Sequence, residues 1–258
     1  MAEGLSDLGF RLEQLRGKAF RATRALSNPN SDPEYAFALL KKIASYLTPD
    51  YRLSSPFVDW FKDRELADHM IRFGDSAEKA HRLMLVSQLL KIVSDIPGDT
   101  AEIGTYRGSS SSLICRANSR SPVAKTHFVF DSFEGLSMPG SRDGEYWKRG
   151  DLTSSYEDLY LTTELDGDFR VMSGWVPDRF YEVKDRRFSF VHIDVDLKDP
   201  TRQSLDFFSA RMASGGIILN DDYGSTRCPG VTEAVDEFAE TTGVKWVALP
   251  AGGAFAIL

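Results

Sequence analysis

Two short acidic clusters stand out because each one follows directly on an apolar run. Asp194 and Asp196 lie in "FVHIDVDLKD" at 190–199, and Asp221 and Asp222 lie in "IILNDDYG" at 217–224. An unpaired carboxylate is costly to bury, so acids at the end of an apolar strand need a charged partner or water. We therefore interpret the two clusters as parts of one site.

The spacing of the clusters predicts how they meet. Residues 200–213 are long enough for a helix that crosses a sheet, so the two apolar runs are expected to be parallel strands of one βαβ unit. The carboxyl ends of such strands share one edge, where open α/β sheets bind ligands. Side chains alternate along a strand, so His192, Asp194 and Asp196 are expected on one side of it.

Four carboxylates at one edge repel one another, which raises their pKa values unless a cation is bound. A divalent ion is the simplest such cation, and oxygen ligands favour Mg²⁺, with Mn²⁺ or Ca²⁺ as alternatives. Three carboxylates could hold the ion and leave one as a base. Solvated acids at helix starts are the structural alternative, which suits Asp199 or Asp222 alone but not both clusters. For His192, a structural and a functional role are both open.

The segment "EIGTYRG", residues 102–108, has the composition of a ligand-binding turn between a strand and a helix. Gly104 permits a tight turn, and Gly108 lets a ligand approach the backbone beside the first N–H groups of the next helix. Glu102 stands where an acid suits a ligand with an ammonium group rather than a dinucleotide. An ordinary strand-to-helix turn is the structural alternative.

Asp131 ends the next apolar run, in "FVFDSFEGL". An acid at the end of the second strand commonly accepts hydrogen bonds from a ribose diol in α/β folds that bind nucleosides. Asp131 or Ser132 could instead begin a short helix, and the two roles are compatible.

Apolar runs of β type alternate with helical ones from residue 100 onward, which predicts an α/β fold with a parallel sheet. The last two runs are separated by only four residues, too few to cross a sheet, and therefore predict an antiparallel hairpin. The expected strands are residues 100–104, 126–130, 169–173, 188–194 and 216–220 in parallel, then 244–249 and 254–258 in the hairpin.

Helices are expected mainly in the first part of the chain, which we take as an N-terminal helical extension, residues 1–95. It would cover a sheet edge, line the ligand pocket or join subunits. Residues 96–258 would carry the site, with the irregular stretch 133–155 as a lid loop. The expected N-terminal helices are residues 7–26, 32–48 and 75–96, the last with Asp75 and Glu78 at capping-box spacing.

Composition narrows the classes of protein. The net charge of −7 and the pI of about 5.2 argue against a nucleic-acid partner, which normally meets a basic face. Cys115 and Cys228 are too few for a disulfide framework and do not form a metal-type pair. No apolar run approaches the roughly 18 residues of a membrane span, and the start is not that of a signal peptide. We expect a cytoplasmic protein with no membrane partner.

In order along the chain, six motifs resemble those of the macrocin-type O-methyltransferases, over roughly residues 36–250. The motifs are "PGDTAEIGTYRGSSS", "DSFEGLS", "GDL" at 150–152, "SGWVPD" at 173–178, "HIDVDLKDPTRQSL" and "GGIILNDDYG". The resemblance implies a class I, Rossmann-like methyltransferase with a seven-stranded sheet. It also implies Mg²⁺-dependent transfer of a methyl group from S-adenosylmethionine to a hydroxyl of a sugar-containing small molecule. A homo-oligomer is expected.

The same resemblance assigns roles to individual residues. Asp196 would be the general base, and the metal ligands would be Asp194, Asp221 and Asp222. The S-adenosylmethionine-binding residues would be Glu102, Gly104, Thr105, Tyr106, Gly108, Ser110, Asp131, Ser132, Ser173, Gly174 and Asp194.

This chain departs from the family pattern at several positions that border the site, none of which removes a ligand. These departures alter the residues around the acceptor and leave its identity open. The positions are Tyr106, Ser109, Val195, Lys198 and Asn220.

Three alternatives compete with this interpretation. "DVD" at 194–196 matches the Asp-x-Asp motif with which nucleotide-sugar glycosyltransferases hold a metal against a diphosphate. Catechol-type O-methyltransferases are a second alternative, although they pair the second metal-binding Asp with Asn, where this chain has Asp221 and Asp222. A cofactor-binding protein without catalysis is the third.

Overall fold

Parallel strands joined by helices make up most of the part of the chain that this computed structural model describes. The described residues are 63–75, 79–157, 159, 167–250 and 252–258, and all lie within the unit Trp60–Leu258. The helices expected at 7–26 and 32–48 lie outside the described residues.

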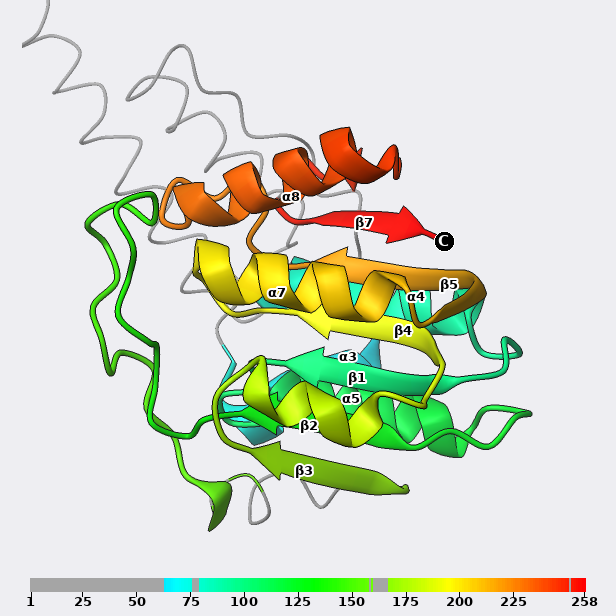
Figure 1. The fold of residues 1–258 in the computed structure, drawn as a ribbon. Coiled ribbons are helices and arrows are strands. Elements are labelled where there is room, and N and C mark those ends of the chain that lie inside the picture. Colours follow the sequence, from blue (N-terminus) through cyan, green and yellow to red (C-terminus); the bar gives the residue numbers. More distant parts are fainter. Residues whose placement is uncertain (1–62, 76–78, 158, 160–166, 251) are drawn as a thin grey trace, which may run out of the picture. The chain divides into compact units, whose positions relative to one another are not determined.

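A single sheet runs through this unit (Figure 1). Its strands are β1 (Asp99–Ile103), β2 (His127–Asp131), β3 (Phe169–Ser173), β4 (Phe188–Ile193), β5 (Met212–Asn220), β6 (Val247–Ala248) and β7 (Ala254–Ile257). The seven strands lie in the order β3-β2-β1-β4-β5-β7-β6. The strands β1 to β5 are parallel, and β7 runs antiparallel to β5 and to β6. The predicted α/β fold with a terminal antiparallel hairpin is confirmed.

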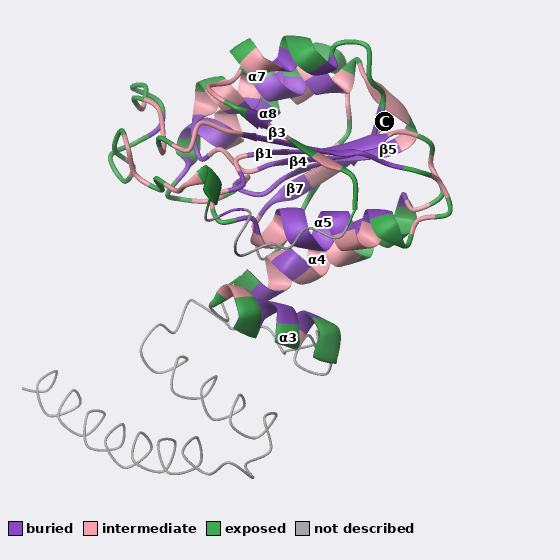
Figure 2. Cartoon of the chain, turned by 90° about the horizontal axis from the view of Figure 1, so that it is seen from below, coloured by how far each residue is buried: buried purple, intermediate pink, exposed green. Residues whose placement is uncertain are grey.

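Helices cover both faces of the sheet (Figure 2). The helices are α3 (Arg64–Phe73), α4 (Ala80–Ile92), α5 (Ser109–Ser119), α7 (Lys198–Ser209) and α8 (Pro229–Thr242). On the face covered by α4 and α5, Val86 and Leu90 of α4 pack with Phe190 of β4. On the other face, Phe208 of α7 packs edge to face on Phe188 of β4. Every residue of β4 is buried, as expected for a strand covered on both faces. Within the described residues, none of the helices is long and apolar enough to cross a membrane.

The helices before the sheet differ from the prediction. The helix α4 begins at Ala80, so the predicted start at Asp75 is wrong, and Glu78 lies outside the described residues. The Asp75 carboxylate accepts a hydrogen bond from the Ser109 hydroxyl at 2.5 Å, which uses it to join α5 instead of capping α4. The helix α3 was not predicted; Asp63 caps it by accepting a hydrogen bond from the N–H of Leu66.

A close backbone contact fixes β1 against the end of β4. Gly104 follows β1 with φ of +82°, and a Cβ built on it would lie 1.9 Å from the carbonyl oxygen of Asp194. The register explains the contact, because Ile103 pairs with Ile193 and the N–H of Asp194 donates to the carbonyl of Ile103 at 2.9 Å. Only glycine combines this conformation with this approach.

Replacing Gly104 by alanine tests this contact. Gly150→Ala is the matched control, because Gly150 has nearly the same φ, +85°, and open space around its Cβ position. The left-handed conformation alone costs about 1–2 kcal/mol, so Gly150→Ala should lose that much unfolding free energy in urea titrations. Gly104→Ala should lose about 3–5 kcal/mol because the clash adds to it. Equal losses in the two variants would contradict the contact.

Candidate functional site

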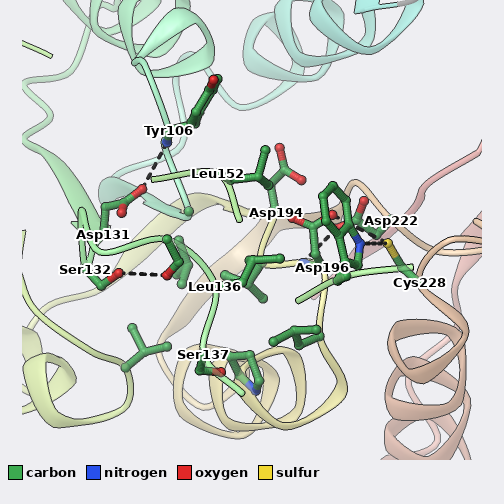
Figure 3. Close-up of a pocket in the computed structure, with 18 of the residues that line it drawn as sticks. Tyr106, Asp131, Ser132, Leu136, Ser137, Leu152, Asp194, Asp196, Asp222 and Cys228 are labelled. Carbon is green, nitrogen blue, oxygen red and sulfur yellow. Dashed lines mark hydrogen bonds between the residues drawn. The ribbon is translucent and has the colours of Figure 1, made fainter. Parts of the chain in front are cut away.

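A cavity of about 510 Å³ opens at the carboxyl ends of the parallel strands (Figure 3). It is bordered by the turn after β1, the end of β2, loop 133–155 and the segments that follow β4 and β5. The predicted site residues that line it are Gly104, Tyr106, Asp131, Ser132, Gly174, Asp194, Asp196 and Asp222.

A second cavity of about 300 Å³ adjoins the first, since Lys79, Arg82, Tyr106 and Asp194 line both. Three further predicted residues line this second cavity, namely Thr105, Ser110 and Asp221. Glu102, Gly108 and Ser173 line neither cavity. Cofactor contacts of these three residues stay predictions.

The four predicted acids, which we call the acid cluster (Asp194, Asp196, Asp221 and Asp222), gather at the ends of β4 and β5. Asp196, Asp221 and Asp222 are buried. The backbone N–H of Asp196 donates to Asp222 Oδ2 at 3.1 Å, which joins the two tips directly. Possible ligand atoms of His192, Asp194 and Asp221 lie within 4.8 Å of one another, as do those of Asp196, Asp222 and Cys228.

Burial and mutual repulsion raise the pKa values of three of these acids. Burial, followed by the charges of neighbouring cluster members, raises the pKa of Asp194 to about 7. Burial is also the main reason that the pKa of Asp196 rises to about 6. The pKa of Asp222 is well above its usual value for the same two reasons. Without further positive charge, the acid cluster is therefore not fully ionised near neutral pH.

Arg82 of α4 supplies part of the missing positive charge. Its guanidinium donates a hydrogen bond to Asp221 Oδ2. Burial would raise the pKa of Asp221, but the nearby positive groups His192, 3.7 Å away, and Arg82 outweigh burial and lower that pKa. Arg82 was not predicted for the site, because it lies 139 residues from Asp221 on a helix without a recognisable motif.

Asp196 has an unusual backbone conformation. The strand β4 ends at Ile193, and Asp196 has φ of +59°. The N–H of Leu197 donates to the carbonyl of Val195 at 2.7 Å, which closes a tight turn around Asp196. The expected alternation along one strand, with His192, Asp194 and Asp196 on one side, is therefore wrong at Asp196. A non-glycine residue held in this region is often part of a functional site.

Cys228 lies beside Asp196 (Figure 3), and Trp147 extends this contact into a chain of hydrogen bonds that ends on Asp196. The indole N–H of Trp147 donates to Cys228 Sγ at 3.3 Å, and the thiol donates to Asp196 Oδ1 at 3.5 Å. Burial, together with the charges of nearby carboxylates, raises the pKa of the Cys228 thiol well above its usual value, so it remains a donor. Neither residue was predicted for the site, because Trp147 and Cys228 are 81 positions apart and no motif links them to Asp196.

Asp131 organises the turn after β1. Its Oδ2 accepts hydrogen bonds from the N–H groups of Thr105 and Tyr106, both at 2.9 Å, and its Oδ1 accepts one from Phe133 at 2.7 Å. Burial raises its pKa, although these hydrogen bonds act in the opposite direction. Asp131 thus fixes the turn that Gly104 begins while it lines the main cavity. Its contact with a ribose stays a prediction.

Glu102 is buried beneath the site. Its Oε1 lies 2.8 Å from His192 Nδ1, and its Oε2 accepts a hydrogen bond from Ser111. Burial would raise the pKa of Glu102, but the hydrogen bond and charge of His192 outweigh burial and lower that pKa. The sequence offered no sign of this pair, since the two residues are 90 positions apart.

The donor set fits a hard divalent cation. The groups gathered at the strand tips are carboxylates, and burial followed by the charges of neighbouring acids raises the pKa values of Asp194 and Asp222 despite the charge of Arg82. Oxygen ligands of this kind suit Mg²⁺ or Mn²⁺. The acid cluster therefore has the charge and the chemistry that such an ion requires.

The strand order, with β7 antiparallel and a ligand cavity at the strand ends, is that of the class I methyltransferase fold. The solved O-methyltransferase NovP is similar, with a TM-score of 0.60 and 24% identity over 71% of this chain and 83% of that chain. The calicheamicin methyltransferase CalS11 has a TM-score of 0.61 and 16% identity over 94% of this chain and 91% of its own. At these identities, the likeness shows the fold.

The family follows from the sequence match. A sequence model of the macrocin-O-methyltransferase (TylF) family matches residues 61–247, so the chain belongs to this family and is an O-methyltransferase. The expected family is confirmed, and the glycosyltransferase alternative is wrong.

Two curated relatives come from Streptomyces. The 8-demethyl-8-(2,3-dimethoxy-α-L-rhamnosyl)-tetracenomycin-C 4'-O-methyltransferase of Streptomyces olivaceus is 29% identical over 81% of this chain and 90% of its own length. The demethyldecarbamoylnovobiocin O-methyltransferase of Streptomyces niveus is 29% identical over 57% of this chain and 60% of its own length.

The pKa values of the acid cluster predict how metal affinity depends on pH. Protons compete with a cation for the proposed ligands Asp194, whose pKa is about 7, and Asp222, whose pKa is also raised. Binding of Mg²⁺ should therefore displace protons, and the affinity should rise by roughly tenfold or more between about pH 5.5 and 8. Calorimetric titrations at several pH values, in buffers that differ in ionisation enthalpy, measure both effects. Equal affinity across this range, without proton release, would contradict the raised pKa values.

Proposed function

We propose that this O-methyltransferase transfers the methyl group of S-adenosylmethionine to a hydroxyl of a sugar or glycosylated small molecule, with Mg²⁺ at the acid cluster and Mn²⁺ as a possible substitute. The observation that carries the proposal is the acid cluster, which places a carboxylate with a raised pKa, Asp196, in the same cavity as the Gly104 turn. The name of the Streptomyces olivaceus relative, which specifies a rhamnosyl group, supports the sugar acceptor.

The residues around β1, β2 and β3 suit the methyl donor. Gly104 brings the backbone close to the cavity, and Asp131 and Ser132 line it at the end of β2, where a nucleoside is expected. Gly174 follows β3 on the same side. These residues would bind S-adenosylmethionine so that its methyl group faces the acid cluster across the cavity.

The residues after β4 and β5 suit the acceptor and the metal. Asp194, Asp221 and Asp222 would hold the ion. When it is bound, Mg²⁺ supplies Lewis acidity that lowers the pKa of a neighbouring acceptor hydroxyl and helps to orient it. Alignment of the hydroxyl oxygen behind the methyl carbon accounts for much of the expected acceleration.

Asp196 is the proposed base. Its raised pKa of about 6 makes it a stronger proton acceptor than an ordinary aspartate and keeps it largely ionised at neutral pH. Cys228 occupies Oδ1 with its S–H group, so we assign proton transfer to Oδ2. The acceptor oxygen bonds to the methyl carbon, its proton moves to Asp196, and the carbon–sulfur bond electrons remain on sulfur, which leaves S-adenosylhomocysteine.

A transfer assay with methyl-labelled S-adenosylmethionine tests the function. The acceptor panel should contain glycosylated aromatic compounds, free sugars, nucleotide sugars and catechols, each with EDTA and with added Mg²⁺. We expect transfer to a sugar-containing acceptor that EDTA abolishes and Mg²⁺ restores. Transfer to catechols alone would support the catechol-type alternative. Activity that is indifferent to EDTA would contradict the metal.

Asp196→Asn tests the base. The amide keeps the size of the side chain but cannot take the proton, so turnover should fall by about 10²–10⁴-fold. The affinity for S-adenosylhomocysteine, measured by calorimetry, should stay within a few-fold of the parent value. Asp206→Asn makes the same chemical change at an exposed helix position paired with Arg202 and should leave turnover unchanged. Turnover in Asp196→Asn near that of the parent would remove Asp196 from this role.

A further inference from the structure

A buried chain of charged groups connects the three central strands beneath the acid cluster. Glu102 of β1 has 0% of its surface exposed and His192 of β4 has 2%. His192 Nδ1 lies 2.8 Å from Glu102 Oε1, and its Nε2 lies 3.7 Å from Oδ1 of Asp221, which follows β5. His192 lines the second cavity, whereas Glu102 lines neither cavity.

The other ring nitrogen of His192 is the atom that needs an explanation. Nε2 is buried and makes no hydrogen bond shorter than 3.5 Å to any residue that the structure describes. Buried polar atoms are almost always satisfied, so an exception often marks a functional site. Because this nitrogen faces the Asp221 carboxylate, its interaction is with a predicted metal ligand.

The backbone holds the imidazole in one place. Glu102 and His192 are direct partners in the parallel pairing of β1 and β4, and His192 pairs with Leu219 of β5. The second carboxylate oxygen of Glu102 accepts a hydrogen bond from the Ser111 hydroxyl. The imidazole is thus held from the side opposite Asp221.

Asp221 is contacted by positive groups of two different kinds. Arg82 of α4, with 34% of its side chain exposed, contacts Oδ2 of Asp221. The His192 side chain of β4, only 3% exposed, faces Oδ1 of the same carboxylate. A cation that binds Asp221 competes with the charge of Arg82, whose long side chain has room to move. His192 has no such room, so its contact is the one that persists when an ion binds.

We propose that the Glu102–His192 pair positions Asp221 for the divalent cation. This inference rests on the proposed metal-dependent function. His192 is a positioning residue, because it acts on the ion through Asp221. Partners that orient a metal ligand typically change metal affinity by about 10–100-fold when they are removed.

Two substitutions of His192 separate its two nitrogens. In His192→Asn the side-chain amide lies near the position of Nδ1, so the contact with Glu102 is kept and the contact with Asp221 is lost. In His192→Gln the amide lies near the position of Nε2, so the contact with Asp221 is kept. Titration with Mn²⁺, followed by the loss of the free-ion electron paramagnetic resonance signal, gives the affinity without any need for an acceptor.

We expect His192→Asn to weaken Mn²⁺ binding by about 10–100-fold and His192→Gln to restore it to within a few-fold. S-adenosylhomocysteine affinity should stay near the parent value in both variants. Ser111→Ala is the control for general damage to the buried chain, because it removes the other hydrogen bond of Glu102 and leaves the contact of His192 with Asp221. It should lower thermal stability but not Mn²⁺ affinity.

Several outcomes would overturn the inference. Parent-like Mn²⁺ affinity in His192→Asn would do so, as would equal weakening in Ser111→Ala. A nitrogen coupling in the bound Mn²⁺ spectrum that disappears in His192→Asn would make His192 a direct ligand instead. If His192→Asn does not fold, His192→Gln alone decides the test. Weakened Mn²⁺ binding in His192→Gln at parent stability would then overturn the inference. Failure of the parent protein itself to bind Mn²⁺ or Mg²⁺ would instead remove the proposed metal-dependent function.

Discussion

Repulsion among the four carboxylates of the acid cluster is the constraint on which the rest of the site depends. Three of these carboxylates are buried, and the pKa values of Asp194, Asp196 and Asp222 are raised, so the fold holds negative charge where water cannot disperse it. Neighbouring side chains offset part of this negative charge or donate hydrogen bonds to it. Arg82 pairs with Asp221, and a thiol donates to Asp196. A divalent cation would complete the same compensation, which is the electrostatic reason for the proposed metal.

The sheet topology determines what the acid cluster faces. The strand order reverses between β1 and β4, and open α/β sheets bind ligands at such a reversal. Gly104, after β1, touches the backbone of Asp194, after β4, so the turn proposed for the donor and the acids proposed for the metal meet across one backbone contact. Methyl transfer needs the donor and the acceptor in line, and this contact keeps their two binding regions in register.

Loop 133–155 lines the main cavity and is connected through Trp147 and Cys228 to Asp196, the proposed base. It contains no helix or strand, as expected. Hydrogen bonds nevertheless fix the loop near both of its ends and in its middle. Leu136 donates to the carbonyl of Asp151, Asp143 accepts from the N–H of Lys198 at 2.7 Å, and Trp147 donates to Cys228. Because Cys228 also contacts Asp196, movement of this loop would alter the surroundings of the base. Closure of the loop over an acceptor stays a prediction.

The sequence by itself determined the α/β class, the strands, the terminal hairpin, the family and the acid cluster, because each leaves a local pattern of apolar runs, turn residues or motif spacing. The tertiary structure alone decided the partners of those acids. Arg82 and Asp221 are 139 positions apart, and Glu102 and His192 are 90 apart, and no local pattern encodes such pairs. It also decided that β4 ends at Ile193 and that Asp196 takes a left-handed turn. An alternating pattern predicts a strand but not its end, which long-range contacts determine.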